Sequence, residues 1–300
     1  MPDERVPIIM NPTAGGGRLR RARAEIEAAA RTCHVELEWW PTAGPGHGEE
    51  LARTAALEGR PLVLAYGGDG TYNEVARGLL GTTTAMGVVP GGTTSVLAYE
   101  LEVPRPAARA IPALARGCDW AMRVGRTDRG GLFLLMLSAG PDSLLLSSVP
   151  PWLKRLGGRC GMALQAVVEL ARRRPLPRLL VTAGGCSREC GWAIVGKSRC
   201  YGGARHGTPA ADPFAPAFEL VLQRAIGRRP GAGFALGLFL TGRHVERLDV
   251  ERSQVDRVRL EGADPGRAVP YQVDGDVVDA LPVEAWVDPQ PLLVRMPAST

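Results

Sequence analysis

Three short apolar runs in the first third of the chain each end in a glycine-rich turn that leads into a helical segment. The three pairs of run and turn are residues 6–10 with 11–17, residues 61–66 with 67–71, and residues 85–89 with 91–93. A strand, a tight turn and a helix repeated in this order predict a doubly wound parallel sheet. Because the carboxyl ends of parallel strands meet at one edge of a sheet, we expect the three turns to gather there as a ligand site.

The pattern changes after residue 122, where short β-like runs replace the alternation and one basic amphipathic helix is expected at residues 160–174. The runs are residues 123–125, 132–137, 179–183, 193–195, 218–222, 255–260 and 272–273. Short strands separated by turns predict an antiparallel β-sandwich or barrel. We therefore expect an α/β chain with a parallel-sheet lobe at residues 1–122 and a β-rich lobe at 123–285. Residues 286–300 should return to the first lobe.

Composition limits the partners that the chain can bind. Apolar residues make up 45% of its 300 residues, and the net charge is +5. A mild basic excess suits an anionic partner such as a nucleotide or an acidic membrane surface, although a plain preference for arginine explains it equally well. Aromatic and basic residues are not interleaved, which argues against nucleic acid as a partner.

No apolar run reaches the roughly 20 residues that span a bilayer. We therefore expect a cytoplasmic protein with peripheral contact, at most, at the inner membrane face. The six cysteines include no CxxC pair, and Cys186 and Cys190 have no matching histidine pair nearby. A zinc site is not expected, and the cysteines are interpreted as buried, reduced thiols. A homodimer is compatible with the sequence.

The glycine-rich turns suit phosphate, because glycine lets the backbone approach a ligand and helix N-termini favour negative charge. The common alternatives fail on residues. The chain has no GxxxxGK(S/T), no GxGxxG after its first strand, no GxSxG and no HExxH. P-loop, Rossmann, hydrolase and zinc-protease chemistry are therefore not expected.

Asp69 is the central acidic residue, because it stands between glycines in the second turn. Its carboxylate could reach a phosphate, a metal ion or an acceptor hydroxyl; the alternative is a turn aspartate that only accepts nearby N–H groups. Asn73 and Glu74 should open the next helix, expected at residues 73–80. Their other interpretation is that they cap the start of that helix, which does not exclude a role in holding the loop.

The segment Gly-Gly-Asp-Gly-Thr-Tyr-Asn-Glu-Val at residues 67–75 resembles the hallmark of the diacylglycerol kinase catalytic-domain family. That family includes sphingosine kinases and many bacterial lipid kinases. Asn11, Thr42 and Gly92 lie in segments similar to its other nucleotide loops. NAD kinases and phosphofructokinases share Gly-Gly-Asp-Gly, but NAD kinases carry their Asn-Glu pair well downstream. The immediate Asn73 and Glu74 favour the lipid-kinase branch.

The resemblance implies two lobes, the first like that of NAD kinases and phosphofructokinases and the second receiving the lipid. It implies an ATP-dependent kinase that binds ATP and Mg²⁺ and transfers the γ-phosphate to a lipid hydroxyl, such as that of diacylglycerol or a long-chain base. It places Asp276 as the general base and Asp69 in a shared charge and metal network. The residues it assigns to nucleotide are Asn11, Thr42, Gly67, Gly68, Asp69, Gly70, Thr71, Asn73, Gly92 and Thr93.

Four positions depart from the family pattern. Ser95 stands where the family often has Asn, and Tyr99 replaces a usual Arg. Asp276 is one methylene shorter than the usual Glu. An acidic Asp-Gly element, which the resemblance ties to a structural Mg²⁺, is lost near Asp212, so Asp212 is the metal candidate that is left.

These departures keep another function open: a kinase-like protein that binds nucleotide or lipid with weak or no turnover. An NAD kinase, which shares the Gly-Gly-Asp-Gly loop, is the less favoured alternative. A stretch rich in basic residues has two interpretations. It either contacts an anionic bilayer or forms the solvent-exposed face of a helix without a partner. Its residues are Lys154, Arg155, Arg159, Arg172, Arg173, Arg174 and Arg178.

Overall fold

The computed structural model describes residues 5–12, 19–92, 95–148 and 176–298. The chain divides into two compact units. The first comprises Met1–Val124, Gly202–Ala204 and Asp288–Thr300, and the second comprises Gly125–Tyr201 and Arg205–Val287. Thr93, the helix expected at residues 160–174 and the basic residues from 154 to 174 lie outside the described residues.

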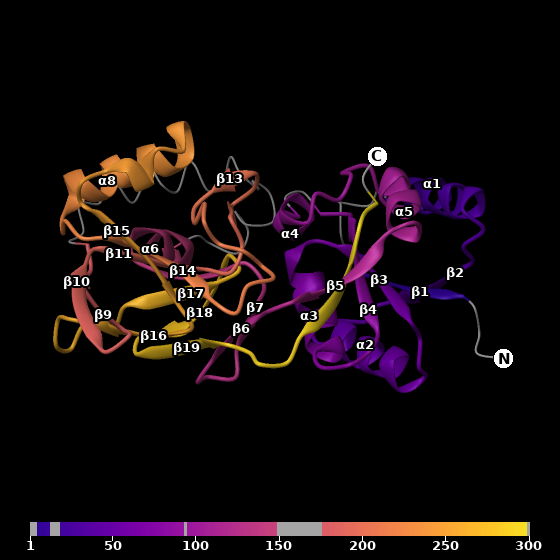
Figure 1. Ribbon diagram of the computed structural model, residues 1–300, viewed down its shortest axis with the longest axis horizontal. Helices are drawn as coiled ribbons and strands as arrows, with labels where there is room; N and C mark the ends of the chain where they lie inside the picture. Colours follow the sequence, from indigo (N-terminus) through magenta and orange to yellow (C-terminus); the bar gives the residue numbers. More distant parts are fainter. Residues whose placement is uncertain (1–4, 13–18, 93–94, 149–175, 299–300) are drawn as a thin grey trace. The chain divides into compact units, whose positions relative to one another are not determined.

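A six-stranded sheet forms the centre of the first unit within its described residues (Figure 1). Its strands, in spatial order, are β2 (Leu37–Pro41), β1 (Val6–Met10), β3 (Leu62–Gly67), β4 (Ala85–Pro90), β20 (Leu292–Met296) and β5 (Cys118–Met122). All run parallel except β5, which is antiparallel to β20. Every residue of β3 and β4 is buried, as expected for the central strands of a sheet with helices on both faces.

The helices of the first unit pack in pairs, α1 with α5 and α2 with α3 (Figure 1). They are α1 (Leu19–Thr32), α2 (His47–Leu57), α3 (Asp69–Leu79), α4 (Val96–Glu100) and α5 (Ala107–Ala115). Gly78 lets α3 approach α2 closely, since a Cβ at this position would lie 2.7 Å from the Cβ of Ala52. This close packing matters for the site, because both helices begin at the same edge of the sheet.

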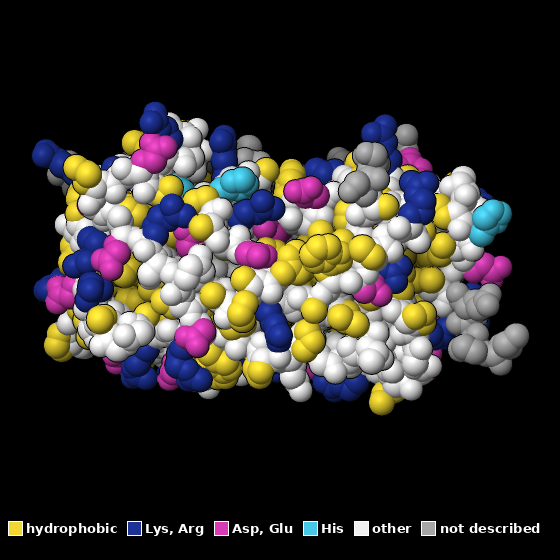
Figure 2. Space-filling view, viewed as in Figure 1, with side chains coloured by type: hydrophobic (Ala, Val, Ile, Leu, Met, Phe, Trp, Pro, Cys, Tyr) yellow, Lys and Arg dark blue, Asp and Glu magenta, His cyan; other side chains and the backbone are white. Residues whose placement is uncertain are grey.

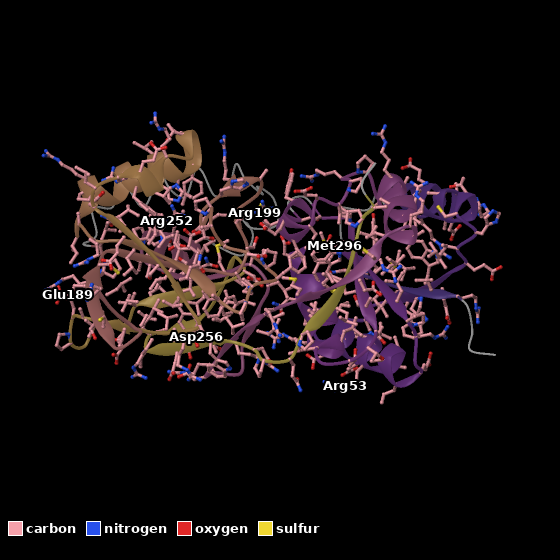
Figure 3. All side chains as sticks on the ribbon, in the orientation of Figure 1. Arg53, Glu189, Arg199, Arg252, Asp256 and Met296 are labelled. Carbon is pink, nitrogen blue, oxygen red and sulfur yellow. The ribbon has the colours of Figure 1, made fainter. Side chains whose placement is uncertain are left out.

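β20 comes from the end of the chain, yet it lies between β4 and β5, and Met296 is its last residue (yellow in Figure 1; Figure 3). Leu292 and Val294 are fully buried. The first unit therefore takes part of its core from residues that follow the second unit in the sequence.

The second unit contains two six-stranded antiparallel sheets and a small two-stranded one, β12 (Cys200–Tyr201) with β13 (Arg205–His206), within its described residues (Figure 1). One sheet consists of β10 (Cys186–Cys190), β9 (Leu179–Ala183), β16 (Arg257–Gly262), β19 (Val283–Val287), β6 (Gly125–Thr127) and β7 (Leu132–Phe133). The other consists of β15 (Val250–Val255), β14 (Phe218–Gln223), β11 (Trp192–Gly196), β8 (Met136–Ala139), β17 (Pro270–Val273) and β18 (Asp276–Ala280). The remaining elements are α6 (Pro141–Ser148), α8 (Arg228–Leu236), the π-helical turn η2 (Gly237–Thr241) and the 3-10 turn η3 (His244–Glu246).

The hydrophobic core of the second unit joins the two six-stranded sheets. Buried side chains from β9, β16 and β19 pack with buried side chains from β8, β11 and β17. Phe133 of β7 stacks on Phe218 of β14, with ring centroids 5.4 Å apart. Two antiparallel sheets that share one core form a β-sandwich.

The expected fold class is confirmed: a parallel-sheet α/β lobe is followed by an antiparallel β-sandwich. The differences concern single elements. The run at residues 132–137 is split into β7 and β8, because Asp274 takes the N–H groups of Leu134 and Leu135 out of the strand pairing. The run at 255–260 spans the end of β15 and the start of β16. The helix expected at 73–80 begins four residues earlier, at Asp69.

The surface carries charges of both signs, which are mixed over the face shown in Figure 2. No helix of the described chain is long and apolar enough to cross a membrane. The five cysteines within the described residues are free thiols. Cys190 and Cys200 are buried as expected, but Cys118 and Cys186 are exposed, because they lie on the outer strands β5 and β10 of their sheets.

Candidate functional site

The candidate site lies at the carboxyl edge of the first sheet, where β1, β2, β3 and β4 end. In the order β2–β1–β3–β4, the connections after β1 and β3 lead in opposite directions along the sheet. The space outside the ends of β1 and β3 is therefore the switch point of the sheet, and ligands of such sheets bind at this point. Asn11 follows β1 at this point, and its N–H donates to the carbonyl oxygen of Tyr66 at 3.4 Å. Thr42 follows β2, and its N–H donates to the carbonyl oxygen of Met10 at 2.9 Å.

Glycines allow the loops after β3 and β4 to touch. The N–H groups of Gly91 and Gly92 both donate to the carbonyl oxygen of Gly67, each at 2.8 Å. A Cβ on Gly92 would lie 2.9 Å from the Cα of Gly68, and a Cβ on Gly67 would lie 2.5 Å from Oγ1 of Thr71. Both distances are too short for real atoms, so the packing of the protein itself requires glycine at these two positions.

Tyr72 and Ser95 close the same pair of loops from the buried side. The Tyr72 hydroxyl donates to the Gly67 carbonyl oxygen at 2.8 Å, and Ser95 Oγ lies 3.3 Å from that hydroxyl. Burial raises the pKa of Tyr72, so the hydroxyl stays a donor. Ser95 has a left-handed φ of 43° and is 2% exposed. The serine that stands where the resemblance expects Asn is therefore an internal part of this loop.

Asp69 begins α3 and holds the loop after β4. Its Oδ2 accepts the N–H of Val96 at 2.9 Å, and its Oδ1 accepts the N–H of Leu97 at 3.0 Å. These are the first N–H groups of α4, which have no carbonyl partner within their own helix. Burial raises the pKa of the Asp69 carboxyl, and the two N–H donors partly offset that rise. Asp69 thus fixes a loop distant in sequence, a role that neither sequence interpretation contained.

Glu74 does the same for the loop after β2. Its two carboxylate oxygens accept the N–H groups of Gly46 and Gly48, each at 3.0 Å. Gly48 must be glycine for this, because a Cβ there would lie 2.6 Å from Glu74 Oε2. His47 adds a further tie, since its Nδ1 accepts the Ala43 N–H at 2.8 Å. Glu74 lies in the second turn of α3 and caps α2, so it holds a loop, and the alternative that it caps its own helix does not apply.

Among the described residues, the start of α3 is open on its outer side. A Cβ on Gly70 would meet no atom of these residues within 4 Å, and a Cβ on Gly68 would approach only Gly92 Cα, at 3.8 Å. Packing within the described part of the chain therefore does not explain these two glycines, in contrast to Gly67 and Gly92. Open space beside backbone N–H groups at the start of an 11-residue helix suits phosphate oxygens. The residues present therefore fit the phosphate chain of a nucleotide.

The residues predicted to bind nucleotide are thus largely brought together. Those at the sheet edge are Asn11, Thr42, Gly67, Gly68, Asp69, Gly70, Thr71 and Gly92. Asn73 lies further along α3, where its Oδ1 accepts the Nε–H of Arg77 at 2.9 Å. The predicted Thr93 lies outside the described residues.

Asp276 is the exposed first residue of β18 in the second unit. The turn before it is fixed by Asp274, whose φ is 51°. The Asp274 carboxylate accepts the N–H groups of Leu134, Leu135 and Met136, each at 2.9 Å. Asp274 is therefore structural, whereas Asp276 is an exposed residue that follows the turn.

Asp142 was missed in the sequence. It is buried at the start of α6, where its Oδ2 accepts the Tyr201 hydroxyl at 2.5 Å and lies 3.4 Å from Gln272 Nε2. Burial raises the pKa of the Asp142 carboxyl, and the Tyr201 hydroxyl opposes that rise. Buried ionisable groups of this kind gather at functional sites. The sequence does contain a signal for Asp142. An apolar run ends at Gly140, and Pro141 with Asp142 then begins a helix, just as Asp69 begins a helix after an apolar strand and glycines in the first unit.

Asp212 does not have the surroundings of a metal ligand. Its side chain is exposed, and its Oδ1 accepts the Phe214 N–H at 2.8 Å. No group of three or more His, Cys, Asp or Glu side chains in the described parts of the chain could hold a metal ion. The structural Mg²⁺ implied by the resemblance therefore does not fit the residues present here.

Comparisons with known proteins agree with the fold and the hallmark segment. Residues 5–127 match the family described as the diacylglycerol kinase catalytic domain. Residues 137–296, more than half of the chain, match the YegS C-terminal NAD kinase beta sandwich-like domain. The two matches follow each other along the sequence in the order of the two units.

Individual relatives carry the same names. A diacylglycerol kinase of Bacillus subtilis is 31% identical over 175 residues, an alignment that covers 57% of each chain. A diacylglycerol kinase of Mycobacterium tuberculosis is 28% identical over 309 residues and covers 98% of this chain and 95% of its own. The crystal structure of a diacylglycerol kinase from Bacillus anthracis superimposes with a TM-score of 0.72 at 16% identity, covering 98% and 97% of the two chains, and supports the fold. The chain therefore belongs to the diacylglycerol kinase catalytic-domain family of lipid kinases, with a β-sandwich domain of the YegS type as its second part.

Proposed function

We propose that the protein is an ATP-dependent kinase that transfers the γ-phosphate of ATP to the hydroxyl group of a lipid. One observation carries the proposal: the two carboxylates of the hallmark segment, Asp69 and Glu74, each hold a neighbouring loop of the same sheet edge. Phosphoryl transfer depends on positioning and on charge stabilisation. Loops fixed before the nucleotide arrives supply the positioning.

Each residue has a defined task in this proposal. The backbone N–H groups at the start of α3, beside Gly68 and Gly70, bind the phosphate chain. Asp69 and Glu74 are positioning residues that act through the loops they hold. The Mg²⁺ that accompanies ATP neutralises charge on the phosphates when it is bound. Asp276 is the general base and accepts the proton of the lipid hydroxyl, a task that suits the carboxylate of an exposed residue that follows a fixed turn.

The acceptor lipid is proposed to be diacylglycerol or a long-chain base, and the names of the relatives favour diacylglycerol. The two other functions predict different products. A nucleotide- or lipid-binding protein without turnover transfers no phosphate, and an NAD kinase phosphorylates NAD.

The test is a transfer assay with γ-³²P-labelled ATP and Mg²⁺. Diacylglycerol, sphingosine, phosphatidylglycerol and ceramide are offered in mixed micelles, and NAD is offered separately. We expect label in one of the lipids. Asp69→Asn should lose nearly all transfer while still binding ATP, because its amide can accept only one of the two N–H groups. Label in NAD, or ATP binding without label in any lipid, would refute the proposal.

Peripheral contact with an anionic membrane is proposed for the basic stretch that ends at Arg178. Arg178 lies in the described part of that stretch and pairs with Glu189 at 2.8 Å. Cosedimentation with phosphatidylglycerol vesicles at low salt should show binding that high salt removes. Absence of binding to these vesicles at low salt would contradict the proposed membrane contact. Separately, light scattering of the same preparation decides whether the protein is a homodimer.

A further inference from the structure

Lys197 is fully buried in the second unit, directly after β11. Its Nζ donates to the backbone carbonyl oxygens of Asp212 at 2.6 Å, Ala215 at 2.7 Å and Ala217 at 3.4 Å. An ammonium group has three N–H donors. Three carbonyl oxygens of one short segment therefore accept from this one side chain.

A lysine in this position needs a specific reason. A buried charge is unfavourable unless polar partners surround it. Lysine occurs at only two positions of this chain, Lys154 and Lys197, whereas arginine is abundant. The guanidinium of arginine is a flat fork, but an ammonium is a compact point charge. Carbonyl oxygens that converge on one point are also the ligands that hard metal cations prefer.

The rest of the segment is held by a second buried charge. Glu219 of β14 is 1% exposed, and its Oε2 accepts the Ala210 N–H at 2.6 Å. Its Oε1 accepts from Arg252 of β15 at 2.6 Å (Figure 3). Glu219 also pairs with Gly196, the residue before Lys197, across β14 and β11. A carboxylate thus fixes the start of the segment, and an ammonium fixes its end.

We propose that the Lys197 ammonium serves as a built-in cation for residues 208–217. It occupies the position in which a metal ion would have to bind the same carbonyl oxygens. Asp212 contributes its carbonyl oxygen to the lysine, and its carboxylate faces solvent. A divalent ion cannot share these oxygens with an ammonium, because the two positive charges would repel each other at close range. The order of the second unit is therefore independent of Mg²⁺, separately from any Mg²⁺ that accompanies ATP.

Nuclear magnetic resonance tests this directly, because the chain has only two lysines. Protein labelled with ¹⁵N-lysine should show one slowly exchanging Nζ–H signal in the wild type. That signal should disappear in Lys197→Met, persist in the matched control Lys154→Met, and stay unchanged on addition of EDTA or Mg²⁺. A wild type without such a signal, or a signal displaced by Mg²⁺, would overturn the proposal.

Thermal unfolding gives a second test. Lys197→Met removes the donor of three half-buried hydrogen bonds to carbonyl oxygens, so the Tm should fall by roughly 5 °C or more, whereas Lys154→Met should match the wild type. The Tm of the wild type should not change with EDTA. In Lys197→Ala, added ethylammonium should restore part of the lost stability. A Lys197→Met protein as stable as the wild type, or a Lys197→Ala protein restored by Mg²⁺ but not by ethylammonium, would contradict the built-in cation.

Discussion

Glu74 is the residue at which the coupling between helix and loop can be measured. Glu74→Gln keeps the size of the side chain and one acceptor oxygen, but it turns an NH₂ group toward the N–H of Gly46 or Gly48. A hydrogen bond to a charged group contributes about 1.5–3 kcal/mol. Glu74 is only half-buried, so water compensates in part, and we expect a loss of about 1.5–2 kcal/mol. That loss corresponds to a fall in Tm of about 3–8 °C for a chain of this size.

The assay pairs thermal unfolding with calorimetric titration of ATP in the presence of Mg²⁺. Thr42 lies in the loop that Glu74 holds, so Glu74→Gln should also weaken ATP binding. The matched control is Glu49→Gln, because Glu49 on α2 pairs with Arg53 at 2.7 Å on the exposed face (Figure 3). A pair of that kind contributes about 0.3–0.5 kcal/mol. If Glu74→Gln is no more harmful than Glu49→Gln in both measurements, Glu74 does not hold the loop.

Three further predictions concern the second unit. Asp276→Asn should abolish lipid phosphorylation in the transfer assay, and Asp276→Glu should retain it. The control is Asp279→Asn on the same strand, which only loses an exposed pair with Arg129 and should behave as the wild type. Equal activity of the two Asn variants would exclude Asp276 as the base. His244 is fully buried, its Nδ1 has no partner among the described residues, and burial lowers its pKa from 6.5. The contribution of His244 to stability is therefore present above pH 6.5 and is lost as the pH falls through the lowered pKa. The Tm of His244→Gln should depend less on pH in this range than the Tm of the wild type. An equal slope of Tm against pH in the two proteins would refute this. Burial raises the pKa of Asp142 above 3.8, so the contribution of Asp142 to the stability of the folded protein is present below pH 3.8 and is lost as the pH rises through the raised pKa. The Tm of Asp142→Asn relative to that of the wild type should therefore increase with pH. A difference in Tm that shrinks with pH would contradict the assignment.

Continuous buried strands and glycine turns were predictable from the sequence. β3 and β4 are apolar throughout and buried throughout, so their composition and their environment agree. β10, β15 and β18 were missed because most of their residues are exposed or half-buried, and polar strands carry little periodic signal. The start of α3 was missed because Gly70 has low helix propensity, although Asp69 is a favourable first residue.

The chemical parts of the site were predictable, but their partners were not. The segment at residues 67–75 predicted the sheet edge that is proposed to bind phosphate, because its glycines and carboxylates are close together in the sequence. Asp69 meets N–H groups 27 and 28 residues away, and Glu74 meets N–H groups 28 and 26 residues away. The ammonium of Lys197 meets carbonyl oxygens 15 to 20 residues further along the chain. Such pairings depend on the packing of whole elements, and spacing in the sequence does not encode them.

Gly70 provides the most direct test of the central claim, that the start of α3 binds the phosphates of ATP. A Cβ at this position meets no atom of the described residues within 4 Å, so Gly70→Ala should leave the Tm unchanged or raise it, since alanine is favoured over glycine in a helix by up to about 1 kcal/mol. The added methyl group would occupy the space assigned to phosphate. Calorimetric titration of Gly70→Ala with ATP and Mg²⁺ should therefore show an affinity reduced by roughly tenfold or more, a loss of about 1.4 kcal/mol. A stable Gly70→Ala protein that binds ATP as tightly as the wild type would contradict the account.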